Sequence, residues 1–184
     1  MAFVVVLTIL FGALSIFNII LTVGIVRRLR EMNAKQRTST ASKGDMPSVM
    51  RTEGEQVDAF EGVTVRHEPI SEQFLSVGPV LTGVFAYGCS SCHERIPEFV
   101  SLVKSQSFDR DRVLVILVGT HGDFTEELLL LDPIATVIVE GRQGPVARAL
   151  GVKAYPALAV IGADGVVRAS GPGVESLAPV ATRR

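Results

Sequence analysis

The chain opens with an uninterrupted apolar run. Residues 2–26 carry no charged side chain, and Arg27, Arg28 and Arg30 follow directly. A helix over this run, rising about 1.5 Å per residue, would reach about 37 Å, which exceeds the hydrocarbon core of about 30 Å. Nothing basic precedes the run, as it would in a cleaved signal peptide. The pattern therefore predicts an uncleaved transmembrane anchor over residues 2–26.

Small and polar side chains share one side of the predicted anchor. On a helix of 3.6 residues per turn the following project within one stripe: Thr8, Gly12, Ser15, Asn18 and Thr22. Such a stripe lets a second transmembrane helix approach closely and hydrogen-bond across the contact. Alternatively, the Ser and Thr hydroxyls bond to their own helix backbone. A transmembrane helix partner is thus one of two interpretations.

A polar segment separates this anchor from the rest of the chain. Residues 27–52 begin basic, continue rich in Thr, Ser and Lys without apolar periodicity, and contain Gly44 and Pro47. These features are typical of a juxtamembrane segment and linker. We therefore expect the folded domain to occupy residues 53–184, which is long enough for one hydrophobic core.

Strand and helix patterns alternate within the predicted domain. Apolar runs predict strands at 78–88, 112–119 and 135–140, and the middle run is typical of a strand buried on both faces of a parallel sheet. Helical patterns follow at 90–105, 123–131, 145–152 and 174–181. Two further apolar runs, 157–162 and 165–170, surround Ala163-Asp164-Gly165 and predict a hairpin. This order predicts an α/β sandwich with a central mixed sheet, preceded by one transmembrane helix.

Composition and charge narrow the possible functions. The chain of 184 residues is 47% hydrophobic and 20% charged, with a net charge of −1. Near-neutral charge argues against a nucleic-acid partner, and the apolar fraction excludes disorder over the whole chain. The two cysteines form one Cys-x-x-Cys pair, which excludes a disulfide scaffold and a four-cysteine zinc site.

The two cysteines lie where a predicted strand meets the following helix. Cys89 stands at the mouth of that helix, where unpaired N–H groups and the helix dipole stabilise a thiolate. Cys92 is one helical turn further on, so it can close a disulfide with Cys89 and would be the more buried, resolving thiol. His93 and Arg95 add positive charge in the first turn, which is expected to lower the pKa of the Cys89 thiol.

The sequence resembles the thioredoxin superfamily, and within it the membrane-tethered TlpA/ResA-like and MauD-like thiol–disulfide oxidoreductases. The matching segments are VFAYGCSSCHERIPEF, VLVILVG and GVKAYPALAVIGADGVV, and the resemblance covers about residues 53–175. It implies that Cys89 is the attacking thiol and Cys92 the resolving thiol. Pro156 takes the place of the family's cis-proline beside the disulfide, and the backbone of Tyr155 would pair with an extended substrate strand.

The function that this resemblance implies is disulfide exchange with protein cysteines through a mixed disulfide on Cys89. It calls for a cysteine-containing protein substrate and a redox partner protein, and no bound cofactor is implied. The family points to maturation of another protein, for example an apocytochrome or a MauD-like assembly. Whether the chain reduces or oxidises its substrate stays open.

Several positions depart from the family pattern. The chain has no Trp, and Tyr87 and Gly88 stand before the first cysteine. Gly83 stands where thioredoxin has a buried Asp as proton acceptor, and Arg95 stands where the TlpA branch often has Glu. The proton relay is therefore unassigned. The candidates share an ionisable side chain near the cysteines: His93, Glu94 and, after a strand expected to end at the same sheet edge, His121.

Rival interpretations use the same cysteines. CSSCH matches the c-type haem attachment motif, with His93 as axial ligand and His121 as a second ligand. The predicted buried strand beside the motif argues against haem attachment. A c-type haem electron carrier nevertheless stays the alternative function. A zinc site would draw on His67, His93 or His121 at no recognisable spacing. An inert structural disulfide closes too short a loop to stabilise much.

Two arguments conflict about the side of the membrane. Arg27, Arg28, Arg30, Lys35 and Arg37 follow the apolar run and no Lys or Arg precedes it, so the positive-inside rule places the domain on the cytoplasmic side. TlpA-like and MauD-like domains usually work outside the cytoplasm, where disulfides persist. We expect a single-pass protein of the cell membrane, and the charge pattern favours the cytoplasmic face.

Overall fold

The computed structural model describes residues 48–177, together with residues 3, 12 and 14. The chain divides into two compact units, Met1–Met46 and Pro47–Arg184. The predicted anchor with its stripe, apart from those three residues, and the linker up to residue 47 lie outside the described residues. Within the described part of the chain, no helix is both long and apolar enough to cross a membrane. The membrane span stays a prediction.

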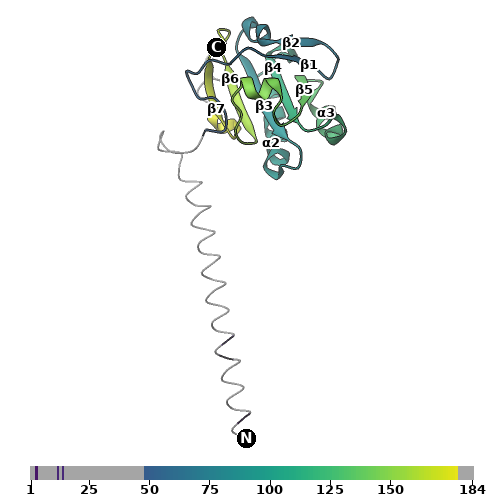
Figure 1. The fold of residues 1–184 in the computed structure, drawn as a ribbon, viewed down its shortest axis with the longest axis vertical. Helices are drawn as coiled ribbons and strands as arrows, with labels where there is room; N and C mark the ends of the chain where they lie inside the picture. The colour runs from purple at the N-terminus through teal and green to yellow at the C-terminus, as the bar shows by residue number, and fades with distance from the viewer. Residues whose placement is uncertain (1–2, 4–11, 13, 15–47, 178–184) are drawn as a thin grey trace. The chain divides into compact units, whose positions relative to one another are not determined.

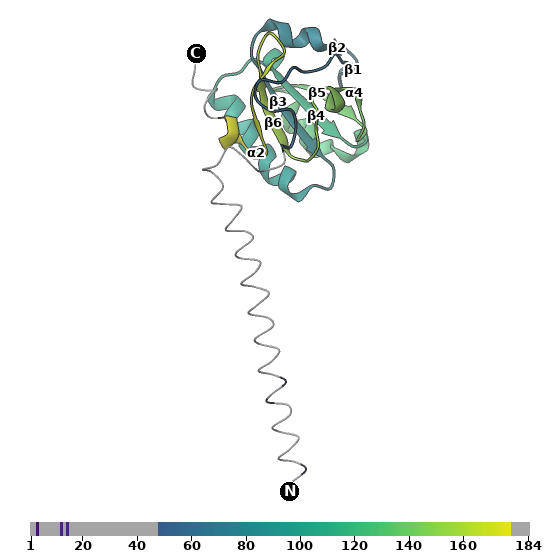
Figure 2. The same cartoon turned by 60° about the vertical axis from the view of Figure 1, so that its left-hand side comes forward.

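A five-stranded mixed sheet forms the centre of the second unit, in the order β5-β4-β3-β6-β7 (Figures 1 and 2). The strands are β3 (Val80–Ala86), β4 (Val113–Val118), β5 (Thr136–Glu140), β6 (Ala157–Ile161) and β7 (Val167–Gly171). The first three run parallel, β6 is antiparallel to β3, and β7 is antiparallel to β6. The mixed sheet and its terminal hairpin confirm the architecture that the sequence predicts.

Helices and a small hairpin cover the two faces of the sheet. On one face, buried hydrophobic side chains of the sheet form a core cluster with those of three helices. These are α2 (Ser90–Ser105), α3 (Thr125–Leu131) and the 3-10 helix η5 (Val174–Leu177). The other face carries α4 (Pro145–Ala149), the hairpin of β1 (Glu61–Val63) and β2 (Pro69–Ser71), and the 3-10 helix η2 (Glu72–Val77). Short 3-10 helices also precede and follow β4: η3 (Arg110–Arg112) and η4 (His121–Asp123). The result is a sheet buried between two layers.

Strand β4 shows how the sequence builds both layers. All six of its residues are buried. Alternate residues enter opposite sides: Val113, Val115 and Leu117 pack with α2, and Leu114, Ile116 and Val118 pack with α4. Because neighbouring side chains of a strand point to opposite faces, a strand covered on both faces must be apolar throughout. This is why the continuous run at 112–119 predicts a central strand.

The beginning of the domain differs most from the expectation. The compact unit starts at Pro47 and Met50 is fully buried, whereas the expected boundary is Glu53. No helix or strand is predicted for residues 53–77, where the structure has β1, β2 and η2. Strands of three residues, with at most one buried side chain each, are too short to produce a detectable period.

This early segment also protects the edges of the central sheet. At the β7 edge, the Gly54 N–H donates to the Val167 carbonyl at 2.9 Å, and the Val167 N–H donates to the Glu55 carbonyl at 2.9 Å. At the β5 edge, the Val65 N–H donates to the Val137 carbonyl at 2.9 Å. Unpaired edge strands invite association with other chains, so these contacts have a protective role.

Candidate active site

One tight turn joins β3 to α2 and carries the two cysteines. Gly88 in this turn has φ +71°, a conformation that other residues adopt only at a cost. The turn brings Cys89 to the N-cap of α2, where its Sγ accepts a hydrogen bond from the Cys92 N–H at 3.2 Å. The structure therefore places Cys89 at the helix mouth, as the sequence predicts.

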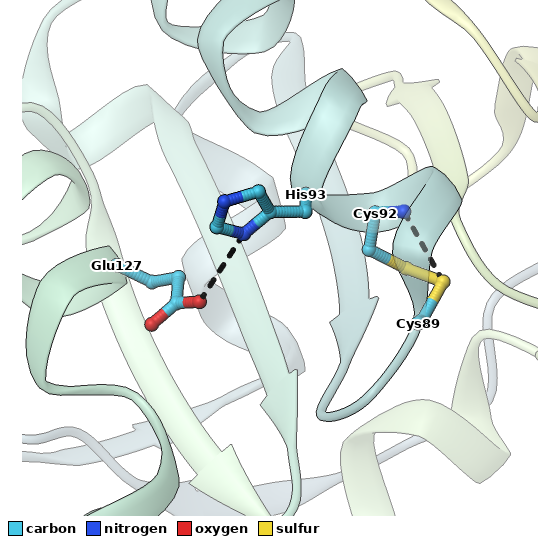
Figure 3. Close-up of a disulfide and its surroundings, with 4 residues drawn as sticks. All are labelled: Cys89, Cys92, His93 and Glu127. Carbon is cyan, nitrogen blue, oxygen red and sulfur yellow. Dashed lines mark hydrogen bonds and ion pairs between the residues drawn. A yellow bond between two sulfur atoms is a disulfide. The ribbon is translucent and has the colours of Figure 1, made fainter.

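Cys89 and Cys92 form a disulfide with their Cα atoms 5.3 Å apart (Figure 3). The two sulfur-bearing residues differ in access: Cys92 is 2% exposed, whereas Cys89 is partly exposed. Cys92 belongs to the same core cluster as Ile96 and Phe99. Cys89 is therefore the more accessible of the two cysteines to an approaching thiol.

The predicted loop residues lie at the same end of the sheet. The peptide bond between Tyr155 and Pro156 is cis, as the resemblance implies for this position. Pro156 directly precedes Ala157, which pairs with Val84 of the antiparallel β3. The start of β6 thus lies next to the end of β3, and β3 leads into the turn that carries Cys89. Tyr155 and Cys89 also pack against the same core cluster.

A hollow of about 300 Å³ opens beside the disulfide, and both cysteines line it. Its wall has an apolar part, formed by Phe85, Ile96 and Phe124, and a polar part, formed by His93 and Glu127. Tyr87, which is 60% exposed, packs edge-to-face on Phe124 with ring centroids 6.0 Å apart. We call this the disulfide hollow.

His93 points away from the disulfide and toward α3 (Figure 3). Its Nδ1 lies 4.0 Å from Oε1 of Glu127. The His93 side chain is 77% exposed and the Glu127 side chain 21%. Glu127 is not predictable from the sequence as a site residue, because its contact with His93 joins α2 to α3, which are separated along the chain. The only local feature that marks Glu127 in the sequence is its place among the acidic residues in the first turn of α3.

The other charged candidates in the first turns of α2 have different surroundings. The Arg95 guanidinium lies 2.6 Å from Glu98 and 3.7 Å from Glu175, and its hydrogen bond to Glu98 raises the pKa of Arg95. Its positive charge is therefore balanced by two carboxylates. Glu94 is exposed on the surface of α2.

The position of thioredoxin's buried Asp is filled by aromatic rings. A Cβ atom on Gly83 would lie 2.9 Å from Cε2 of Phe85 and 3.1 Å from Cε2 of Phe99. The two rings themselves pack edge-to-face with centroids 5.7 Å apart. A carboxylate at this position has no room, so the glycine is a packing requirement.

Glu140 is a half-buried acid that no local pattern in the sequence marks. It ends β5 and is half-buried, and its carboxylate accepts hydrogen bonds from the N–H groups of Val146 at 3.2 Å and Ala147 at 2.7 Å. Burial raises the pKa of Glu140, and the two hydrogen bonds oppose this effect. The contacts join β5 to the first turn of α4, on the opposite face from α2. Its role is to cap α4 rather than to serve the cysteines.

The remaining histidines belong to other segments. His67 lies in the turn between β1 and β2, and the backbone of His121 begins η4 after β4. The side chain of His121 lies outside the described part of the structure. Among the described side chains, no group of three or more His, Cys, Asp or Glu could hold a metal ion.

The cysteine motif does not fit a c-type haem in this fold. Such a haem bonds covalently to both sulfurs and takes the adjacent histidine as axial ligand. Here Cys92 is enclosed by core side chains, and His93 is directed at Glu127. Attachment would require the first turns of α2 to leave the core.

No protein-family model matches this sequence, and no curated protein matches it. Solved structures do match. The thioredoxin domain of a thiol-disulfide oxidoreductase from Bacteroides vulgatus superposes with a TM-score of 0.57 at 14% identity, covering 71% of this chain and 96% of that one. A thio-disulfide isomerase from Thermus thermophilus gives 0.55 at 20% identity, covering 73% and 99%.

A third match is an exposed lipoprotein thioredoxin from Streptococcus pneumoniae, with a TM-score of 0.52 at 22% identity, covering 67% of this chain and 98% of that one. Together with the strand order described above, these similarities establish a thioredoxin-like α/β fold. The described domain is a thioredoxin-like domain with a Cys-x-x-Cys disulfide at the N-terminus of α2.

Proposed function

We propose that this chain is a thiol–disulfide oxidoreductase that exchanges its Cys89–Cys92 disulfide with cysteines of another protein. One observation carries the proposal: a disulfide at a helix N-terminus joins a partly exposed cysteine, Cys89, to a buried one, Cys92. Solved proteins of similar fold bear the names thiol-disulfide oxidoreductase, thio-disulfide isomerase and thioredoxin, which is consistent with this activity.

The exchange proceeds in two balanced steps. A substrate thiolate attacks Sγ of Cys89, a mixed disulfide forms, and Cys92 leaves as a thiolate. A second substrate thiolate then attacks the substrate sulfur of the mixed disulfide and releases Cys89 as a thiolate. The substrate loses two electrons and the Cys89–Cys92 pair gains them. Running both steps in reverse reduces a substrate disulfide.

The helix mouth favours Cys89 as the group that attacks and leaves. The Cys92 N–H, 3.2 Å from Sγ of Cys89, and the positive end of the α2 dipole both stabilise a thiolate there. Cys92 lies in the core and serves as the resolving thiol. Its only target is Sγ of Cys89 in the mixed disulfide, which is one helical turn away, so Cys92 does not need to be exposed.

The Tyr155–Pro156 loop forms the other side of the proposed substrate site. Its preceding residues are fixed, because the N–H groups of Lys153 and Ala154 both donate to the Val49 carbonyl, at 2.8 and 3.2 Å. A fixed loop beside the disulfide can present the Tyr155 backbone to an extended substrate strand. In this arrangement Pro156 lines the site without taking part in proton transfer.

The amino-acid sequence supports three further properties that we propose: a membrane anchor, a role in maturation and a cytoplasmic orientation. Residues 2–26 would anchor the domain in the cell membrane, and the family resemblance favours a role in maturation of another protein. The basic residues after the anchor favour the cytoplasmic face.

The activity is tested with the purified full-length chain in detergent. It should accelerate reduction of a protein disulfide such as that of insulin by dithiothreitol, because Cys89 exchanges faster than a small thiol. The same chain alkylated at both cysteines is the control. A chain that gives no acceleration over dithiothreitol alone, or that shows a Soret band, would contradict the proposal and favour the haem alternative.

The side of the membrane can be read from labelling of the same two thiols, which are the only cysteines of the chain. After mild reduction, intact cells are treated with a membrane-impermeant maleimide and compared with lysed cells. A domain on the cytoplasmic face is labelled only after lysis. Labelling in intact cells would place the domain outside the cytoplasm and contradict the orientation expected from the basic residues that follow the anchor.

A further inference from the structure

The disulfide hollow has one negatively charged group in an otherwise largely apolar wall. Of the residues that line it, only Glu127 carries a carboxylate. Phe85, Ile96 and Phe124 supply apolar surface, and the exposed ring of Tyr87 stands at the rim. A ligand that suits this lining has an apolar stem and a cationic end.

The Glu127 carboxylate has capacity for such a ligand. Its contact with His93 Nδ1 is 4.0 Å long, which is beyond hydrogen-bond distance, and the imidazole lies mostly in solvent. A carboxylate can accept about four hydrogen bonds, so one distant imidazole leaves room for a donor. A ligand entering the hollow can take the place of His93 without disturbing the core.

Position ties the hollow to the exchange reaction. Cys89 lines it, and a mixed disulfide on Cys89 fixes the substrate cysteine at its rim. Neighbouring Cα atoms along a substrate chain are about 3.8 Å apart. The side chain of a residue flanking the substrate cysteine therefore starts within reach of the hollow.

We propose that the disulfide hollow is a specificity subsite that takes a Lys or Arg flanking the reactive cysteine of the substrate, with Glu127 as counter-charge. The inference rests on the proposed function. The apolar wall accommodates the methylene stem, as long cationic side chains commonly bury their stems and keep the charged end at a polar group. An acidic flanking residue would meet the Glu127 charge and be disfavoured.

The test compares short peptide disulfides as substrates of the reduced full-length chain at neutral pH. The peptides are symmetrical dimers of Gly-Gly-Xaa-Cys-Gly-Gly and Gly-Gly-Cys-Xaa-Gly-Gly, with Xaa as Lys, norleucine or Glu. Norleucine keeps the stem of Lys without its charge. Rates with dithiothreitol on the same peptides correct for the effect of Xaa on the peptide's own sulfur.

After this correction, the Lys peptide in one of the two arrangements should react about fivefold faster than the Glu peptide, with norleucine between them. Glu127→Gln should remove most of this preference, and Glu127→Lys should reverse it. Glu126→Gln is the matched control, because Glu126 lies beside Glu127 on α3 and does not line the hollow. That variant should keep the preference.

Failure of this inference is distinct from failure of the proposed function. If all peptides react at equal corrected rates, or if Glu126→Gln and Glu127→Gln have the same effect, the subsite is overturned while disulfide exchange stands. Equal rates for norleucine and Lys would overturn the role of Glu127. If no peptide disulfide reacts with the reduced chain, both proposals fall.

Discussion

Cys89→Ser is expected to bring disulfide exchange down to the uncatalysed rate, a loss of about 10³-fold or more. Serine keeps the N-cap hydrogen bond to the Cys92 N–H but has no sulfur to form a mixed disulfide. The remaining thiol, Cys92, is 2% exposed and packs in the core, so it cannot substitute as the attacking group. The measurement is the insulin reduction assay with the full-length chain.

Ser91→Ala is the matched control for this loss. Ser91 lies between the two cysteines, is exposed, and does not line the disulfide hollow. It should exchange disulfides within about twofold of the wild-type rate, since surface substitutions of this kind are nearly neutral. A Cys89→Ser chain that exchanges as fast as the control would show that Cys89 is not the attacking thiol.

Gly83→Asp is expected to have the largest effect on stability. Even a Cβ atom here would lie 2.9 Å from the ring of Phe85 and 3.1 Å from that of Phe99, and overpacking of this kind costs about 1–3 kcal/mol. The carboxylate would add the cost of an unpaired buried charge, which is several kcal/mol more. We expect the free energy of unfolding to fall by at least about 3 kcal/mol, with Gly83→Ala falling by the smaller amount.

Urea denaturation of the full-length chain followed by circular dichroism measures both losses. Gly141→Ala is the control, because a Cβ atom there meets nothing within 4 Å. Should Gly83→Asp leave the free energy of unfolding unchanged, the ring of Phe99 must move aside. The site would then accept the buried acid that thioredoxin carries at this position.

The main elements of the fold follow from local patterns. Helix α2 begins at Ser90 and ends at Ser105, the bounds that its apolar periodicity and the preceding Gly88 predict. Strand β4 is equally predictable, because a strand buried on both faces has no polar position to interrupt its run. The position of Cys89 at the helix mouth follows from these two facts.

Features that depend on contacts between distant segments could not be predicted in the same way. The burial of Met50 depends on core partners from other strands and helices, and nothing in the polar sequence around it marks it as core. The meeting of His93 with Glu127 depends on how α2 lies beside α3. The close fit of Gly83 against Phe99 likewise appears only when helix and sheet pack together.

The most direct test of the central claim is trapping with Cys92→Ser. Without the resolving thiol, the mixed disulfide on Cys89 cannot be released internally, so partner proteins should stay attached during expression of the full-length chain. Non-reducing electrophoresis after alkylation should show adducts that dithiothreitol dissolves, and mass spectrometry should locate the bond at Cys89. Adducts on Cys92 in the Cys89→Ser chain, or no adducts in either variant, would contradict the assigned roles of the two cysteines.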